Sequence, residues 1–300
     1  MHEFTTLLAK HGHTVEKRLD TLLSDQIQNG EISRPKNLIK AMRYGVLNGG
    51  KRLRPFLVIQ SAALFDVPVE HSLDVACALE CIHCYSLIHD DLPAMDNDIL
   101  RRGKPTVHVA FDEATAILAG NALLTFAFEI IAHKASILST DIRIKLITSL
   151  AQSAGLGGML GGQMLDLEAE KRPQESTDII TLQHMKTAAL ISFACQAGAI
   201  IGNASKELTE KLTDFGTYLG LAFQLTDDLL DVTANTQTLG KTAGKDETAQ
   251  KATFVHLYGI KETQKKRDTL ISKAEAFLHP FGAKALPLQQ AAHFSAIRKN

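Results

Sequence analysis

The segment from Ala188 to Ile201 is apolar on nearly every face of the helix that its residue spacing predicts. Such a helix needs neighbours on all sides and belongs in the middle of a bundle. Apolar residues recur at helical spacing through almost the whole chain, and the alternation typical of strands is nearly absent. We therefore expect an all-α bundle. Long helices are predicted at 70–92, 111–133, 140–168, 177–202 and 205–233, and shorter ones at 4–24, 36–48, 54–65, 247–258 and 261–279.

The composition favours one domain that covers residues 1–300. Hydrophobic residues make up 45% of the chain, enough for a large core, and no linker-like stretch divides it. The formal charge of −1 argues against a nucleic-acid partner. No apolar run reaches the ~18 residues that span a bilayer, and the start lacks the pattern of a secretory signal. A cytoplasmic protein with no membrane span is expected.

The cysteines at 77, 81 and 84 follow the spacing of one helix face. His83 lies among them, but no second Cys/His pair stands nearby to complete a zinc site. Free cysteine usually behaves as a small buried hydrophobe. We therefore expect these thiols to pack in the core.

Two acidic clusters stand at the ends of long apolar stretches, Asp90, Asp91 and Asp96 in the first and Asp227, Asp228 and Asp231 in the second. Carboxylates in that setting are costly to bury without a cation. Mg²⁺ prefers oxygen ligands and often bridges protein carboxylates to phosphates. Two such clusters facing each other across a pocket would hold a diphosphate between metal ions.

The two clusters differ in their local geometry. Asp227 and Asp231 are four residues apart and stack on one helix face. Asp90 and Asp96 are six apart and converge only if the helix breaks. Pro93 provides that break, because it cannot donate the helical hydrogen bond.

Basic residues accompany the acidic clusters. Arg101 and Arg102 follow the first cluster and have the geometry of phosphate forks. Gly50, Lys51 and Arg54 lie at a predicted helix N-terminus, where backbone amides favour anions. The spacing is not that of a Walker A loop.

Further polar and glycine positions interrupt the apolar helices. Lys186 lies between apolar stretches, which favours an inward, anion-facing role. The glycines between 155 and 162 are compatible with either of two arrangements, close helix–helix contact or close approach of backbone to a ligand. The stretch 234–246 has the character of a long loop, and such loops often act as lids.

Together these motifs resemble the family of trans-isoprenyl diphosphate synthases, and the resemblance covers essentially the whole chain. The elements occur in the family's order: Gly-Gly-Lys-Arg-Leu-Arg-Pro at 49–55, Asp-Asp-x4-Asp at 90–96, Arg-Arg-Gly at 101–103, Lys-Thr at 186–187, Gln-x2-Asp-Asp-x2-Asp at 224–231 and Gly-Lys at 240–241. The resemblance implies the isoprenoid synthase fold, an all-α bundle around a deep central cavity with the two Asp motifs on opposite walls. It also implies a homodimer.

The same resemblance implies a role for each matching residue. Three Mg²⁺ ions, with Mn²⁺ as a possible substitute, would bind to Asp90, Asp91, Asp96, Asp227, Asp228 and Asp231. The allylic diphosphate would contact Arg101, Lys186 and Lys241. Isopentenyl diphosphate would contact Gly50, Lys51, Arg54, His83 and Arg102. Thr187 and Gln224 would stabilise the allylic cation, and the tail at Arg298-Lys299 is similar to the family's C-terminal closing element.

The length of the product depends on the residues that precede the first Asp motif. Tyr85 lies five residues before Asp90, about 7.5 Å along a helix. Tyr85, with Ser86 beside it, is similar to the bacterial farnesyl diphosphate synthases, which implies that the ring floors the cavity at a C15 product. Ordinary core packing of Tyr85 is the alternative.

Other functions compatible with the motifs are a geranylgeranyl diphosphate synthase with a C20 product, a class I terpene cyclase and a non-catalytic subunit of a heteromeric synthase. The second Asp-Asp-x-x-Asp and the basic elements at 49–55 argue against the cyclase. Such non-catalytic subunits lose an Asp motif, and both motifs are intact here.

Overall fold

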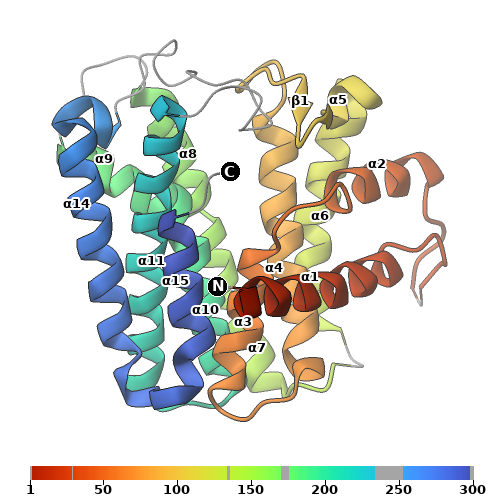
Figure 1. Ribbon diagram of the computed structural model, residues 1–300. Coiled ribbons are helices and arrows are strands. Elements are labelled where there is room, and N and C mark those ends of the chain that lie inside the picture. Colours follow the sequence, from red (N-terminus) through yellow and green to blue (C-terminus); the bar gives the residue numbers. More distant parts are fainter. Residues whose placement is uncertain (1, 29, 134–135, 170–175, 234–252, 298–300) are drawn as a thin grey trace.

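The computed structural model describes residues 2–28, 30–133, 136–169, 176–233 and 253–297 of the 300-residue chain. Its described residues form an all-α bundle with a single short hairpin (Figure 1). The first half contains α1 (His2–Leu22), α2 (Lys36–Val46), α3 (Leu53–Ala63), α4 (Val69–Asp90), β1 (Leu100–Arg101), β2 (Lys104–Pro105), α5 (Val107–Ala110) and α6 (Glu113–Ala132). The second half contains α7 (Thr140–Ala154), α8 (Met159–Ala169), α9 (Ser176–Gln183), the π-helical turn η1 (His184–Ala188), α10 (Ala189–Ile201), α11 (Lys206–Thr233), α14 (Phe254–Phe277), the 3₁₀ helix η2 (His279–Ala285) and α15 (Leu286–Ile297).

Two of the predicted long helices are divided. The helix expected at 140–168 breaks into α7 and α8, because Gly155 caps α7 and the chain turns at 155–158. A Cβ at Gly158 would lie 2.0 Å from the carbonyl oxygen of Ser153, so this turn requires a glycine. The helix expected at 177–202 contains η1 between α9 and α10.

The last two expected helices also differ from the structure. The helices predicted at 247–258 and 261–279 are one element, α14, with a kink at Gly259, whose φ of 76° is left-handed. Glycine tolerates this φ without strain. The chain therefore kinks at Gly259 within one helix, where the sequence predicts an interruption between two helices. The part of the first prediction at 247–252 lies outside the described residues.

The middle of the bundle is formed by α4 and α10, which pack against each other and both contact α3. The apolar segment 188–201 is buried along most of its length, as its sequence predicts. Cys77, Cys81 and Cys84 on α4 are buried and free, which confirms that they pack in the core. Burial raises the pKa of the Cys84 thiol to about 12, so the thiol is unreactive at neutral pH.

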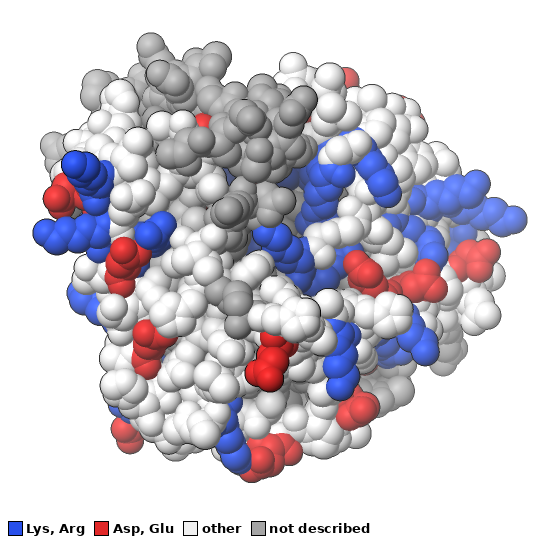
Figure 2. All heavy atoms as spheres, viewed as in Figure 1, with Lys and Arg blue, Asp and Glu red and all other residues white. Residues whose placement is uncertain are grey.

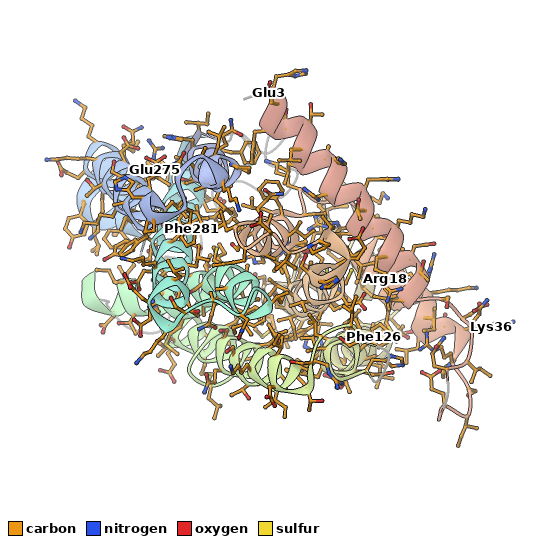
Figure 3. All side chains as sticks on the ribbon, turned by 90° about the horizontal axis from the view of Figure 1, so that it is seen from below. Glu3, Arg18, Lys36, Phe126, Glu275 and Phe281 are labelled. Atoms are coloured by element: carbon orange, nitrogen blue, oxygen red, sulfur yellow. The ribbon has the colours of Figure 1, made fainter. Side chains whose placement is uncertain are left out.

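The first helix lies along the outside of this core. Figure 3 views the bundle from below and shows α1 crossing it, with Arg18 in the half of the helix that leads toward α2. The Nε of Arg18 donates to Asp74 Oδ1 on α4 across 2.7 Å, and its Nη2 donates to Oδ2 across 3.0 Å. This bidentate pair fixes α1 against α4.

In the part of the chain that the structure describes, one helix, α6, is long and apolar enough by length and composition to cross a membrane. The sequence was expected to contain no stretch long and apolar enough to span a bilayer, and α6 is an exception by length and composition. In the bundle, α6 packs against α4 and α2, as a core helix does. Its outer face keeps large apolar side chains in solvent, including Ile117 and Leu118.

Candidate active site

The first acidic cluster folds back on itself where α4 ends. The helix stops at Asp90, ahead of Pro93, as the sequence predicts. The backbone N–H of Asp96 then donates to the Asp90 carbonyl oxygen across 2.8 Å. This turn brings the two carboxylates into electrostatic contact. Burial, with the nearby Asp96 charge as a further cause, raises the pKa of Asp90 to about 6.

Asp91 is buried, with 2% of its surface exposed. Its two carboxylate oxygens accept three hydrogen bonds from Arg101, which lies on the β1–β2 hairpin, at 2.6 to 2.9 Å. Burial raises the pKa of Asp91, although the Arg101 guanidinium opposes the shift. The hairpin thus delivers one predicted phosphate-binding side chain directly to one predicted metal ligand.

The second acidic cluster lies near the C-terminal end of α11, at the same end of the bundle as the C-terminal end of α4 (Figure 1). Asp228 and Asp231 are buried, with 3% and 9% of their surface exposed, and Asp227 is half-buried. A solvated acidic helix end would be exposed, so the burial of Asp228 and Asp231 contradicts that arrangement.

Lys186 links the two sides of this end of the bundle. It lies on η1, where its Nζ contacts Asp166 Oδ2 on α8 at 2.5 Å. Its positive charge also opposes the rise in the pKa of Asp90 on α4. The lysine therefore lies within electrostatic reach of the first acidic cluster.

The basic elements at 49–54 and 101–102 lie together although they are far apart in sequence. Arg102 Nη1 donates to the Gly49 carbonyl oxygen. A Cβ at Gly50 would lie 2.8 Å from the Arg102 guanidinium, so glycine leaves the room that this side chain fills. Figure 2 shows Lys and Arg side chains gathered to the right of the centre of this face.

Arg54 and His83 form a second basic pair beside that loop. Arg54 Nη1 lies 3.5 Å from His83 Nε2. Burial, reinforced by the charge of Arg54, holds the pKa of His83 well below its usual range. His83 is therefore neutral, and its Nε2 is an acceptor. Lys51 lies over the ring of Phe294 on α15, 5.3 Å from the centroid.

Arg52, inside the same motif, points the other way. Its φ of 52° is left-handed, and only 3% of its surface is exposed. The guanidinium donates to Glu80, Glu16 and the carbonyl oxygen of Val46. This buried anchor holds the loop that carries the flanking Lys51 and Arg54.

The glycines at 161 and 162 pack against protein backbone. A Cβ at Gly162 would lie 2.2 Å from the backbone nitrogen of Lys186, and one at Gly161 would lie 1.9 Å from the carbonyl oxygen of Leu156. Of the two arrangements that the sequence allows, close helix contact is the one observed at these positions. Gly162 lets α8 approach η1 at the residue that carries the inward lysine.

Tyr85 and Ser86 lie one turn before Asp90 on α4. Tyr85 is 2% exposed, and its ring meets the ring of His89 edge-on at 5.8 Å. Its hydroxyl is buried with no hydrogen-bond partner among the described residues. The Ser86 hydroxyl donates to the His83 carbonyl oxygen across 2.9 Å.

A model of the polyprenyl synthetase family matches residues 35–277. The chain belongs to the polyprenyl synthetase family. A farnesyl diphosphate synthase from Bacillus subtilis is 39% identical over 278 residues, 92% of this chain and 92% of the relative. A geranylgeranyl diphosphate synthase from Cyanophora paradoxa is 41% identical over 267 residues, 89% of each.

A solved structure agrees with this family. It is that of a geranyltransferase from Helicobacter pylori complexed with magnesium and isoprenyl diphosphate. It matches with a TM-score of 0.80 and 34% identity, covering 96% of this chain and 96% of that chain. As a polyprenyl synthetase family member, the chain is a prenyltransferase, a trans-prenyl diphosphate synthase with the all-α isoprenoid synthase fold. This result argues against the alternative function as a class I terpene cyclase.

One residue of this candidate site was missed by the sequence reasoning. Gln183 donates to Asp228 Oδ2 across 3.1 Å in the interior. Its position four residues before Thr187, about one helical turn, was the available signal. Lys241 and the tail at 298–299, which were predicted to contribute, lie outside the described residues.

Proposed function

We propose that this protein is a magnesium-dependent farnesyl diphosphate synthase. It would condense isopentenyl diphosphate head-to-tail with dimethylallyl or geranyl diphosphate and release diphosphate. The observation that carries the proposal is the position of Asp90, whose half-buried carboxyl group lies beside Asp96 and within the electrostatic reach of Lys186. Such a group is poised to exchange its proton for a cation that also holds a phosphate.

The donor set fits magnesium, because it consists of carboxylate oxygens that burial has partly desolvated. No group of three or more potential ligands is preassembled among the described residues. In our proposal, three Mg²⁺ ions, replaceable by Mn²⁺, bind through Asp90, Asp91, Asp96, Asp227, Asp228 and Asp231. When bound, they neutralise charge that develops on the leaving diphosphate.

The basic residues divide between the two substrates. Arg101 and Lys186, with Lys241, would hold the allylic diphosphate and absorb negative charge as its C–O bond breaks. Gly50, Lys51, Arg54, His83 and Arg102 would hold isopentenyl diphosphate. Because His83 Nε2 faces Arg54, the proton of the neutral ring resides on Nδ1.

Thr187 and Gln224 would face the allylic cation. The double bond of isopentenyl diphosphate attacks that cation, a C–C bond forms, and the new cation loses a proton to the released diphosphate. No dedicated histidine base is needed for this last step. The apolar walls exclude the water that would otherwise trap the cation.

The chain length rests on Tyr85, whose buried ring one turn before Asp90 would floor the cavity at C15, with Ser86 beside it. A C20 product is the second candidate, because the Cyanophora paradoxa relative is a geranylgeranyl diphosphate synthase.

We further propose that residues 1–300 act as one polyprenyl synthase domain in a homodimer. The support is an apolar face on α6, α7 and α8 that includes Ile117, Leu118, Ile144, Leu160 and Met164, each at least 44% exposed. A second copy would cover this face. In this proposal the enzyme is cytoplasmic, with neither a membrane span nor a nucleic-acid partner.

The deciding experiment is a product assay with isopentenyl diphosphate, dimethylallyl diphosphate and Mg²⁺, read by chain length. A C15 product supports the proposal, and a C20 product keeps the chemistry but moves the floor deeper. No condensation product from the folded protein with Mg²⁺ present would overturn the proposal.

A further inference from the structure

A chain of buried side-chain hydrogen bonds connects the second acidic cluster to Thr187. Gln183 Nε2 donates to Asp228 Oδ2 across 3.1 Å, and Gln224 Nε2 donates to Asp228 Oδ1 across 3.0 Å. The Thr187 hydroxyl donates to Gln224 Oε1 across 2.8 Å. The backbone N–H of Phe254, at the start of α14, also donates to Asp228 Oδ2 across 3.4 Å. Three elements, α9, α11 and α14, therefore meet at this carboxylate, and Gln224 connects it to η1.

The hydrogen bonds of this series can run in only one direction. A carboxylate has acceptors and no donor, so each glutamine must turn its NH₂ group toward Asp228. The oxygen of Gln224 must then face Thr187. Since a threonine hydroxyl has a single proton, that proton is committed to Gln224, and the two lone pairs of the oxygen point away from it.

The donor–acceptor direction of these hydrogen bonds is fixed because water has little access to the side chains that form them. Gln183, Thr187 and Asp228 are 5%, 9% and 3% exposed. In such surroundings a lost partner leaves an unsatisfied polar group, and neighbouring hydrogen bonds strengthen one another. The orientation of the Thr187 oxygen thus depends on residues that do not contact it.

Both carboxylate oxygens of Asp228 already accept hydrogen bonds. We propose that Asp228, although it belongs to the ligand set proposed above, does not contact the metal directly, and that Asp228 and Gln183 are positioning residues that act through Gln224 to fix the polarity of the Thr187 hydroxyl. The oxygen lone pair is then presented permanently to an electron-poor carbon, and the proton is kept away from it. A hydroxyl free to rotate would turn its proton toward the cation part of the time and destabilise it. This inference rests on the proposed function, because it assigns Thr187 to the allylic cation.

Substitution of Asp228 by asparagine tests the polarity with almost no change of shape. The introduced amide can donate to Gln224 Oε1, so the Gln224 amide can flip and donate to Thr187 instead. The Thr187 proton would then be released toward the substrate. We expect Asp228→Asn to lower kcat by about 10- to 100-fold, as for loss of an oriented polar group in an active site, with KM for both diphosphates within about threefold.

The decisive measurement is a double-mutant cycle of Asp228→Asn with Thr187→Val. If Asp228 acts through Thr187, the double variant is no slower than Thr187→Val alone, because no hydroxyl remains to misdirect. Independent, additive losses would overturn the proposal. Asp214→Asn, the same chemical change at an exposed position of the same helix, is the matched control and should leave kcat unchanged.

Binding of Mn²⁺ with substrate analogue, followed by electron paramagnetic resonance, separates positioning from metal ligation. We expect the Mn²⁺ affinity of Asp228→Asn to stay within about threefold of the wild type. A drop of tenfold or more would overturn the proposal and assign Asp228 to the metal. If Asp228→Asn does not fold, Gln183→Met replaces it in the cycle and should lower kcat by about three- to tenfold, again without effect in the Thr187→Val background.

Wild-type turnover is measured first and keeps the two proposals apart. If the folded wild type forms no condensation product, the proposed function is wrong. If the wild type is active but the losses in the double-mutant cycle are additive, only the positioning role is wrong.

Discussion

The guanidinium of Arg52 and the carboxylate of Glu80 lie 2.6 Å apart in the interior, with 1% and 3% of their side chains exposed. Removing one partner of such a pair strands the other charge. We expect Glu80→Ala to lower the free energy of unfolding by about 3–5 kcal/mol in urea titrations. Glu16→Ala, at the outer end of the same network and 38% exposed, should cost less than about 1 kcal/mol. Equal losses in both variants would contradict a buried anchor.

The acidic clusters should be essential for turnover and dispensable for folding. We expect Asp90→Ala and Asp227→Ala to lower kcat by at least about 100-fold, since charge on the leaving diphosphate is no longer neutralised. Circular dichroism should show the helix content of the wild type, and the melting temperature should not fall below that of the wild type. Near-normal turnover in either variant would refute the assignment.

The raised pKa of Asp90 gives a sign for the pH dependence of stability without metal. Its folded-state value is about 6 against 3.8 for the free side chain, so the folded chain binds the proton more tightly than the unfolded chain does. Stability therefore falls as the pH rises from about 4 through about 6, by up to ~3 kcal/mol.

Denaturant titrations of the metal-free protein between pH 4 and pH 8 can measure this loss as the difference between the wild type and Asp90→Asn. The variant lacks the titrating carboxyl group, so its stability relative to the wild type should increase over this window. A constant difference between the two proteins would show that Asp90 titrates at its ordinary pKa.

The Tyr85 ring should set the product length. We expect Tyr85→Ala to lengthen the product beyond C15, because the buried ring no longer limits the depth of the cavity. Tyr85→Phe is the matched control, since it keeps the ring and removes only the hydroxyl that lacks a partner among the described residues. It should keep the wild-type product with equal or greater stability. An unchanged product from Tyr85→Ala would leave the ring an ordinary core residue.

The contact between Gly162 and the Lys186 backbone should be intolerant of a methyl group. A Cβ there would lie 2.2 Å from the Lys186 nitrogen, so Gly162→Ala must displace η1 and its side chains. We expect kcat to fall by at least about tenfold, since small displacements of positioning groups are costly. Gly157→Ala, which would meet nothing within 4 Å, should leave kcat within about twofold of wild type. A similar kcat in both variants would contradict the role of this contact.

Much of this site follows from local sequence. The break at Pro93 and the apolar spacing of 188–201 each depend on a few neighbouring residues, and both are seen as predicted. The pairing of Asp91 with Arg101 could not be predicted, because it depends on the hairpin that returns Arg101 to the end of α4. The position of Gln183 likewise becomes meaningful only when α11 brings Asp228 to it.

The boundaries that were wrong depend on contacts between elements. The turn at 155–158 and the π-helical turn at 184–188 both occur where α8 approaches η1. Helical periodicity continues across both segments, so the spacing of apolar residues alone predicts one continuous helix where packing produces separate elements.

The π-helical turn η1 also restricts how the chain can change its length. A turn with i→i+5 hydrogen bonds holds one residue more than an α-helical turn, so η1 amounts to a single-residue insertion between α9 and α10. The wider turn takes up its extra residue locally, so deleting one residue from 184–188 would let a regular α-helix form while the helices on either side keep roughly their present orientation. A single deletion within α9 or α10 would instead rotate the side chains on one side of it by about 100° relative to those on the other. Within this segment, η1 is therefore the place where the chain can lose one residue while Gln183 and α10 keep their present neighbours.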